Sequence, residues 1–209
     1  MKMIAAIAAI AAIAAIAALG LLSTAHAQTA KVGEPAPDFE AVTSKGETVS
    51  LSDFAGEHVV LEWTNDGCPF VQKHYGSGNM QSLQGRTTAD GTVWLSVISS
   101  APGEQGYADG ARADALTEER GAKPTHVLLD PEGEIGRLYG ARTTPHMYVV
   151  DAEGTLAYAG AIDTIASTDP ADVPRADNYV EAALDALKAG QAVTVRQTQP
   201  YGCSVKYAG

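Results

Sequence analysis

Two cysteines are the side chains of this chain best suited to chemistry, and Cys68 has the more informative surroundings. It precedes Pro69, and proline is well tolerated at the first position of a helix because its missing N–H would have no partner there. We therefore expect Cys68 to cap a helix that begins at Pro69. Unpaired N–H groups and the helix dipole favour the thiolate, the reactive form of cysteine. The alternative is that Cys68 is a small buried hydrophobic residue.

The segment before Cys68 predicts how the thiol is positioned. Residues 59–61 form a continuous apolar run of the kind a buried parallel strand shows. A polar turn at 64–67 links this strand to the helix, which glycines at 76 and 78 should interrupt. Within the helix, we expect Lys73 to be solvated.

The remaining pattern predicts an α/β fold. Strands are expected at 39–42 and 48–51 as an N-terminal β-hairpin, and further strands and helices follow in alternation. The expected strands are 92–98, 127–129, 147–150, 156–159 and 193–195, and the expected helices are 108–120, 135–139 and the helix capped by Asn178 and ended by Gly190. This order requires a central mixed β-sheet flanked by helices on both faces.

The first 27 residues are typical of a secretory signal peptide. Lys2 precedes a long apolar run, and Ala25-His26-Ala27 resembles a cleavage site. We expect cleavage after Ala27, one domain over 28–209, and a periplasmic or secreted protein without membrane attachment. The alternative is an uncleaved anchor, since the apolar run is about long enough to span a bilayer. In an oxidising compartment the even pair of cysteines can form a disulfide.

Charge and histidine spacing exclude other classes of function. The net charge is −11 with scattered basic residues, which argues against nucleic acid and anionic membranes as partners. Four of the histidines are spread along the domain without ligand spacing, so we expect no metal and no cofactor. His74 and His146 are candidates to approach Cys68 and lower its pKa. Asp66 would oppose the thiolate if it pointed inward.

Several motifs resemble a known family. Segments 33–39 and 51–56 and the strand–Cys–Pro–helix unit are similar to redoxins, the alkyl hydroperoxide reductase/thiol-specific antioxidant (AhpC/TSA) branch of the thioredoxin superfamily. The blocks GCPFV at 67–71, TTP at 143–145 and GCSVKY at 202–207 resemble an exported thioredoxin-like subgroup. The similarity runs from about residue 32 to the final helix, and it implies a thioredoxin fold.

The resemblance also assigns residues. Cys68 matches the nucleophilic cysteine of the thioredoxin C-x-x-C pair, and Val71 stands where the second cysteine would be. Thr144-Pro145 matches the threonine and cis-proline that lie against this cysteine, so we expect a cis bond there. Relatives that reduce peroxides use a P-x-x-x-T-x-x-C motif and a remote arginine. Here Leu61 stands at the position of the proline and Asn65 at that of the threonine. Thr64 lies one residue from the threonine position, and Arg142 lies near the position of the arginine.

Cys203 can be interpreted in three ways. The simplest is an exposed thiol in the tail, and the other two involve a bond to Cys68. A Cys68–Cys203 bridge would close a loop of about 136 residues, and chain entropy would then contribute ~5 kcal/mol, enough for a purely structural disulfide. Alternatively, Cys203 resolves a mixed disulfide formed on Cys68, as Val71 cannot. The two interpretations differ in how readily the bond is reduced.

Three functions follow from these residues. The leading one is an exported thiol–disulfide oxidoreductase that exchanges with a protein thiol or disulfide and takes electrons from a thiol reductant. The second is a thiol peroxidase in which Cys68 becomes a sulfenic acid and Cys203 condenses with it. The third is a non-catalytic binding module with a structural disulfide. In the two enzymes, Thr144 and Pro145 shape the site and Pro69, Thr64, Asn65, Arg142 and His146 support it.

Overall fold

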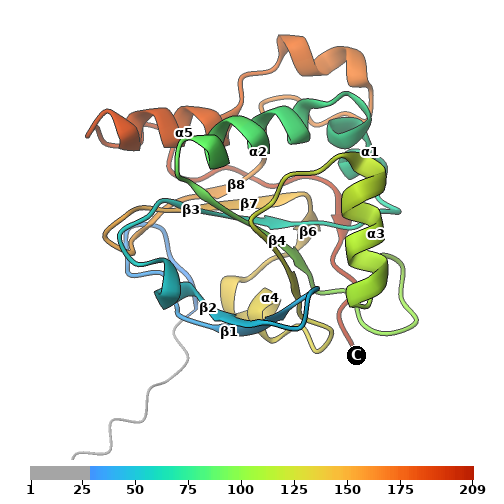
Figure 1. The fold of residues 1–209 in the computed structure, drawn as a ribbon. Helices are drawn as coiled ribbons and strands as arrows, with labels where there is room; N and C mark the ends of the chain where they lie inside the picture. The colour runs from blue at the N-terminus through green and yellow to red at the C-terminus, as the bar shows by residue number, and fades with distance from the viewer. Residues whose placement is uncertain (1–28) are drawn as a thin grey trace, which may run out of the picture.

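A computed structural model describes residues 29–209 of the chain. The expected signal peptide, residues 1–27, lies outside the described residues. Among residues 29–209, the helices are all too short or too polar to cross a membrane. Figure 1 shows a central sheet with helices packed above and below it.

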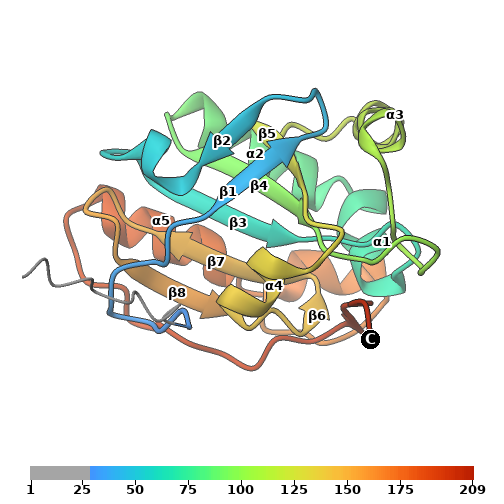
Figure 2. The same ribbon diagram turned by 90° about the horizontal axis from the view of Figure 1, so that it is seen from below.

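The main sheet is mixed, as the sequence predicted. Its strand order is β2-β1-β5-β4-β3-β7-β8. The three central strands β3, β4 and β5 run parallel, and the hairpin β1–β2 and the pair β7–β8 extend the two edges antiparallel (Figure 2). The strands are β1 (Glu40–Thr43), β2 (Thr48–Ser50), β3 (Val59–Trp63), β4 (Val93–Ile98), β5 (His126–Leu129), β7 (His146–Val150) and β8 (Leu156–Gly160).

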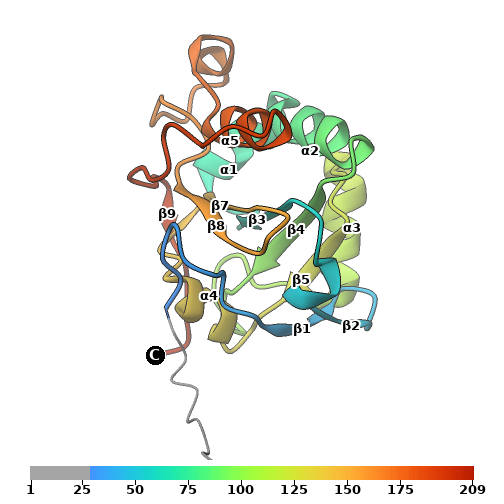
Figure 3. The same ribbon diagram turned by 90° about the vertical axis from the view of Figure 1, so that its left-hand side faces the viewer.

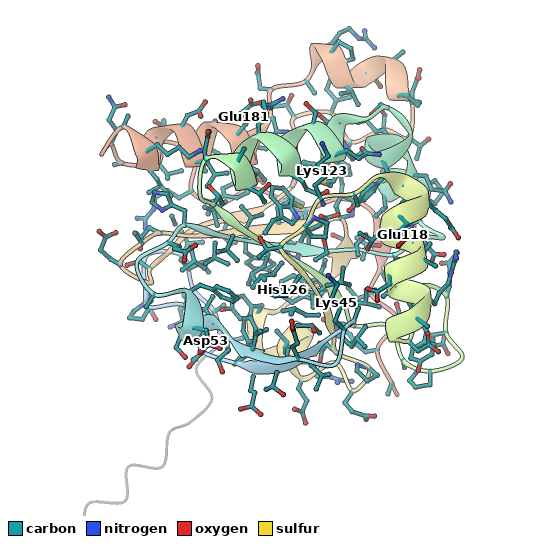
Figure 4. All side chains as sticks on the ribbon, in the orientation of Figure 1. Lys45, Asp53, Glu118, Lys123, His126 and Glu181 are labelled. Atoms are coloured by element: carbon teal, nitrogen blue, oxygen red, sulfur yellow. The ribbon has the colours of Figure 1, made fainter. Side chains whose placement is uncertain are left out.

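Helices cover both faces of this sheet. Figure 3 shows α1, α2 and α5 on one side, and α4 with the N-terminal hairpin on the other. The α-helices are α1 (Pro69–Gly76), α2 (Asn79–Ala89), α3 (Gly110–Arg120), α4 (Glu134–Tyr139) and α5 (Tyr179–Lys188), and the 3-10 helices are Leu51–Phe54 and Pro170–Arg175. Charged side chains such as Glu118 on α3 and Glu181 on α5 lie outside these layers (Figure 4).

Strand β3 is buried along its whole length, which explains its apolar sequence. Val59, Leu61 and Trp63 pack with the hairpin and α4, while Val60 faces a second cluster with residues of α1, α2 and α5. The strand that leads to Cys68 is therefore held from both faces. The predicted break in the following helix is present, since α1 ends at Gly76 and α2 begins after Gly78, whose φ is 75°.

The C-terminal tail returns along the edge of the sheet. It runs beside β8, where Arg196 O accepts from Ala159 N and Thr198 N donates to Ala159 O. It ends in a two-residue strand β9 (Cys203–Ser204), which pairs antiparallel with β6 (Thr143–Thr144). The strand expected at 193–195 was wrong, because this segment reaches no partner strand: Val193 is buried against the α5 cluster, and Val195 is exposed.

Candidate active site

Cys68 lies at the N-terminal tip of α1, as its sequence context predicted. Its backbone is extended (φ −84°, ψ 119°), and Pro69 occupies the first helical turn. The side chain is 0% exposed, and Sγ donates to the carbonyl oxygen of Thr144 at 3.0 Å. The thiol is thus both at a helix tip and in contact with the TTP block from the other side of the site.

The Thr144–Pro145 peptide bond is cis, which confirms the prediction from the motif. Thr144 contacts both cysteines through its backbone. Its carbonyl oxygen faces Cys68 Sγ, and in the β6–β9 pair it stands opposite Cys203. Both cysteines are free thiols in this structure. The TTP block therefore brings together two sulfurs that are far apart in the sequence.

The pKa of Cys68 is lower than its ordinary value. Burial raises it, but hydrogen bonds that favour the thiolate outweigh burial; these come from the Cys203 thiol, the backbone of Val71, the backbone of Cys203 and the side chain of Thr144. Cys68 is the sulfur that carries negative charge most readily.

The pKa of Cys203 is shifted in the opposite direction, to about 11. Burial raises it first, and the hydrogen bond to Cys68 and the negative charge of Cys68 raise it further. Lys206 lowers it slightly. Cys203 therefore keeps its proton and donates it toward Cys68 while Cys68 is a thiolate. When the two thiols together hold one proton, that proton lies on Cys203 rather than on Cys68.

The tail around Cys203 is closely fitted to the site. A Cβ atom on Gly202 would lie 2.0 Å from the Thr144 carbonyl oxygen, and φ at this glycine is 137°, a region that L side chains rarely adopt. Downstream, Val205 N donates to Arg142 O at 3.0 Å and Ala101 N donates to Lys206 O at 2.8 Å. Gly202 belongs to the GCSVKY block, but the sequence did not predict its close approach to Thr144.

Asn65 and Thr64 serve the loop before Cys68. The Asn65 side chain accepts from Gly67 N at 2.9 Å and donates to Gln105 O at 3.2 Å, and its backbone carbonyl accepts from Cys68 N. Thr64 Oγ1 is buried and has no hydrogen-bond partner among residues 29–209, and it borders a cavity of about 30 Å³ beside α3. The residues that line this cavity do not include Cys68.

Arg142 and His146 lie on either side of the TTP block in the sequence and contact each other. Arg142 N donates to His146 Nδ1 at 3.3 Å, and Tyr148 Oη lies 3.1 Å from the same nitrogen. Burial, with help from the positive charge of Arg142, lowers the pKa of His146 to about 3. His146 is neutral at pH 7 and therefore brings no positive charge to the site.

Lys73 is not solvated, contrary to the sequence-based expectation: it is 1% exposed, and Nζ lies 3.5 Å from Asp163 Oδ2. The same region holds His74, whose pKa burial lowers to about 4. Asp66 points toward Arg112, with 3.7 Å between the charged atoms. Within residues 29–209, no three His, Cys, Asp or Glu side chains meet in a way that could hold a metal ion.

Comparisons with known proteins agree with this geometry. Residues 32–159 match the model of the AhpC/TSA family. No match was found among curated proteins. Among solved structures, a hypothetical protein from Sinorhizobium meliloti is 22% identical with a TM-score of 0.72, and the alignment covers 87% of this chain and 97% of that one.

Two further solved structures have names that describe a redox function. An exposed lipoprotein thioredoxin from Streptococcus pneumoniae is 25% identical (TM-score 0.51; 73% of this chain and 98% of that chain covered). The thioredoxin domain of a thiol-disulfide oxidoreductase from Bacteroides vulgatus is 19% identical (TM-score 0.51; 70% and 98% covered). These likenesses confirm the thioredoxin fold.

Proposed function

Because this chain belongs to the AhpC/TSA family, we propose that it is a thiol–disulfide oxidoreductase in which Cys68 is the nucleophile and Cys203 resolves the intermediate. The chain is a redox enzyme of thioredoxin fold. The observation that carries the cysteine assignment is the pair of opposite pKa shifts at two sulfurs that meet at Thr144.

The proposed reaction has two exchange steps. The Cys68 thiolate attacks a substrate disulfide RS–SR′, which forms Cys68–S–SR and releases R′S⁻. Cys203 then loses its proton and attacks the Cys68 sulfur, which forms the Cys68–Cys203 disulfide and releases RS⁻. The substrate gains two electrons, and the enzyme is oxidised by two. A thiol reductant then returns both cysteines to thiols.

The first step prepares Cys203 for the second. The hydrogen bond to Cys68 and the negative charge of Cys68 are two of the three causes that raise the pKa of Cys203. Both disappear when the Cys68 sulfur is bonded to a substrate sulfur. The Cys203 thiol then ionises more easily, and the ionised form is the attacking species.

A trapping experiment tests this order of events. Reduced Cys203→Ser protein, mixed with one equivalent of a small peptide disulfide, should keep a mixed disulfide on Cys68 that peptide mapping locates. Wild-type protein should instead release both halves of the peptide and hold the Cys68–Cys203 bond. A mixed disulfide that persists in the wild type would contradict the proposal.

The family assignment also supports a second candidate, a thiol peroxidase with the same two cysteines. Two features weigh against it: the Asn65 side chain is engaged by Gly67 and Gln105, and the cavity that Thr64 borders is not lined by Cys68. Stopped-flow oxidation by hydrogen peroxide separates the candidates. A rate no faster than that of free cysteine would remove the peroxidase.

The third candidate, a non-catalytic module with a structural disulfide, predicts a different redox potential. A Cys68–Cys203 potential below about −300 mV would favour it, because structural disulfides resist reduction by thiol pools. We propose a higher potential for the Cys68–Cys203 bond.

We also propose that the protein is exported and that residues 1–27 are removed. The N-terminus of the exported protein, read by mass spectrometry, should begin at Gln28; retention of Lys2 would contradict cleavage.

A further inference from the structure

The tail that carries Cys203 is attached to the core by a buried cluster centred on Asp163. Tyr201 Oη donates to Asp163 Oδ1 at 2.5 Å, and Ile165 N donates to the same oxygen at 3.0 Å. Lys73 Nζ lies 3.5 Å from the other carboxylate oxygen and also donates to Ile165 O at 2.9 Å. This carboxylate joins three separate segments, namely the tail, α1 and the loop after β8.

The ring of Tyr201 packs directly on the active-site helix. Its centroid lies 5.7 Å from that of Phe70, and Lys73 Nζ lies 5.8 Å above the ring. His74 Nε2 is 3.2 Å from Tyr201 Oη. Cys68 caps this same helix two residues before Phe70. The helix that presents the nucleophile therefore also holds the tail.

The cluster is a rigid attachment because its charges are buried. Lys73 is 1% exposed and Asp163 is 4% exposed, and charged groups are almost never buried to this extent without a partner. Burial raises the pKa of Tyr201, and Asp163 raises it further, so the hydroxyl keeps the proton that it donates. Tyr201 stands only two residues before Cys203, so this attachment lies close to that sulfur in the chain.

We propose that Tyr201 is a positioning residue for Cys203: its hydrogen bond to Asp163 and its ring contact with Phe70 together hold the tail on α1 so that the Cys203 sulfur faces Cys68. This inference rests on the proposed function and names a residue for its second step. The contact raises the effective concentration of Cys203 at the Cys68 sulfur. The first step is attack by Cys68, whose thiolate is also stabilised by Val71 and Thr144, so loss of the anchor affects it less than the second step.

The test separates the two steps with 5,5′-dithiobis(2-nitrobenzoate). Attack by Cys68 releases one coloured aryl thiolate and leaves an aryl disulfide on Cys68, and attack by Cys203 on that sulfur releases the second aryl thiolate. Tyr201→Phe keeps the ring and removes the hydroxyl. We expect the second phase to be about tenfold slower than in the wild type, since a hydrogen bond to a charged group is lost, and the first phase to slow by much less.

Two further variants make the result specific. Tyr107→Phe removes a hydroxyl from a 39%-exposed tyrosine elsewhere and should leave both phases unchanged. Phe70→Leu removes the ring contact but keeps the Tyr201–Asp163 bond, so it should slow the second phase by less than Tyr201→Phe. Phe70→Leu also serves as the test if thermal unfolding shows that Tyr201→Phe is poorly folded.

The outcomes distinguish the anchor from the proposed function. A second phase of Tyr201→Phe within twofold of the wild type, or, if that variant is poorly folded, an unchanged second phase in Phe70→Leu, would overturn the anchor. Equal slowing of both phases would overturn it too, because the nucleophile would then be affected. A wild-type protein that never releases the second thiolate would overturn both proposals.

Discussion

Cys68 and Cys203 bring the same thiol group to one site from two different kinds of structure. Cys68 caps α1 after the turn that follows a strand buried along its whole length, and its own side chain is buried. Cys203 lies in a two-residue strand near the end of the chain and is only partly buried. The pKa of the first is lowered and that of the second is raised, so the surroundings rather than the residue type distinguish the two thiols.

The comparison also shows that the two environments depend on each other. The Cys203 thiol is a leading donor to the Cys68 thiolate, and the charge on Cys68 raises the pKa of Cys203. Neither sulfur would behave in the same way alone. Variants that alter one region while the other stays intact therefore test whether the two thiols depend on each other.

The largest effect is expected from loss of the helix-tip sulfur. Cys68→Ser should reduce steady-state turnover of a peptide disulfide, with a dithiol as reductant, at least about a hundredfold, because the thiolate nucleophile is gone. Cys203→Ser should also lose turnover but still form one mixed disulfide per chain. If Cys68→Ser formed that adduct as fast as Cys203→Ser, the assignment of roles would be reversed.

The next effect concerns the buried charges under the tail. Lys73→Ala should lower the free energy of unfolding by about 3–5 kcal/mol, because Asp163 is left buried without its charged partner. The exposed pair Lys188–Asp90 provides the control, since Lys188→Ala should cost less than about 1 kcal/mol. Denaturant unfolding measures both. Equal losses in the two variants would contradict the structural role of the cluster.

A smaller change is expected from the tail itself. Gly202→Ala places a Cβ against the Thr144 carbonyl oxygen and should cost about 1–3 kcal/mol in seating β9 on β6. Formation of the Cys68–Cys203 disulfide should slow, and adduct formation at Cys68 should slow by less. Gly209→Ala, at the end of the chain in open space, is the matched control. Normal disulfide formation in Gly202→Ala would show that the tail need not be closely seated.

The sequence predicted the helix-tip region better than the tail region. The Cys68-Pro69 cap and the break between α1 and α2 follow from neighbouring residues, and the cis Thr144–Pro145 bond was expected from the resemblance of the TTP block to thioredoxins. Lys73 was misjudged because the segments that cover it, around 163–165 and 201, are distant in the sequence.

The tail was harder to predict because its conformation is set by what it docks on. The β-branched run at 193–195 is typical of a strand but meets no partner strand in the fold. Tyr201 and Gly202 both precede Cys203. No local sequence pattern reveals that Tyr201 contacts Asp163 or that Gly202 lies against Thr144. Only the tertiary structure brings these groups together.

The most direct test of the account is a thiolate titration by ultraviolet absorbance in the wild type, Cys68→Ala and Cys203→Ala. In the wild type, one thiol should ionise below the ordinary cysteine pKa and the other near pH 11. The low value should rise in Cys203→Ala, where a donor is lost, and the high value should fall in Cys68→Ala, where the negative charge is lost. Two wild-type thiols that titrate together, each unchanged when the other is removed, would contradict the central claim.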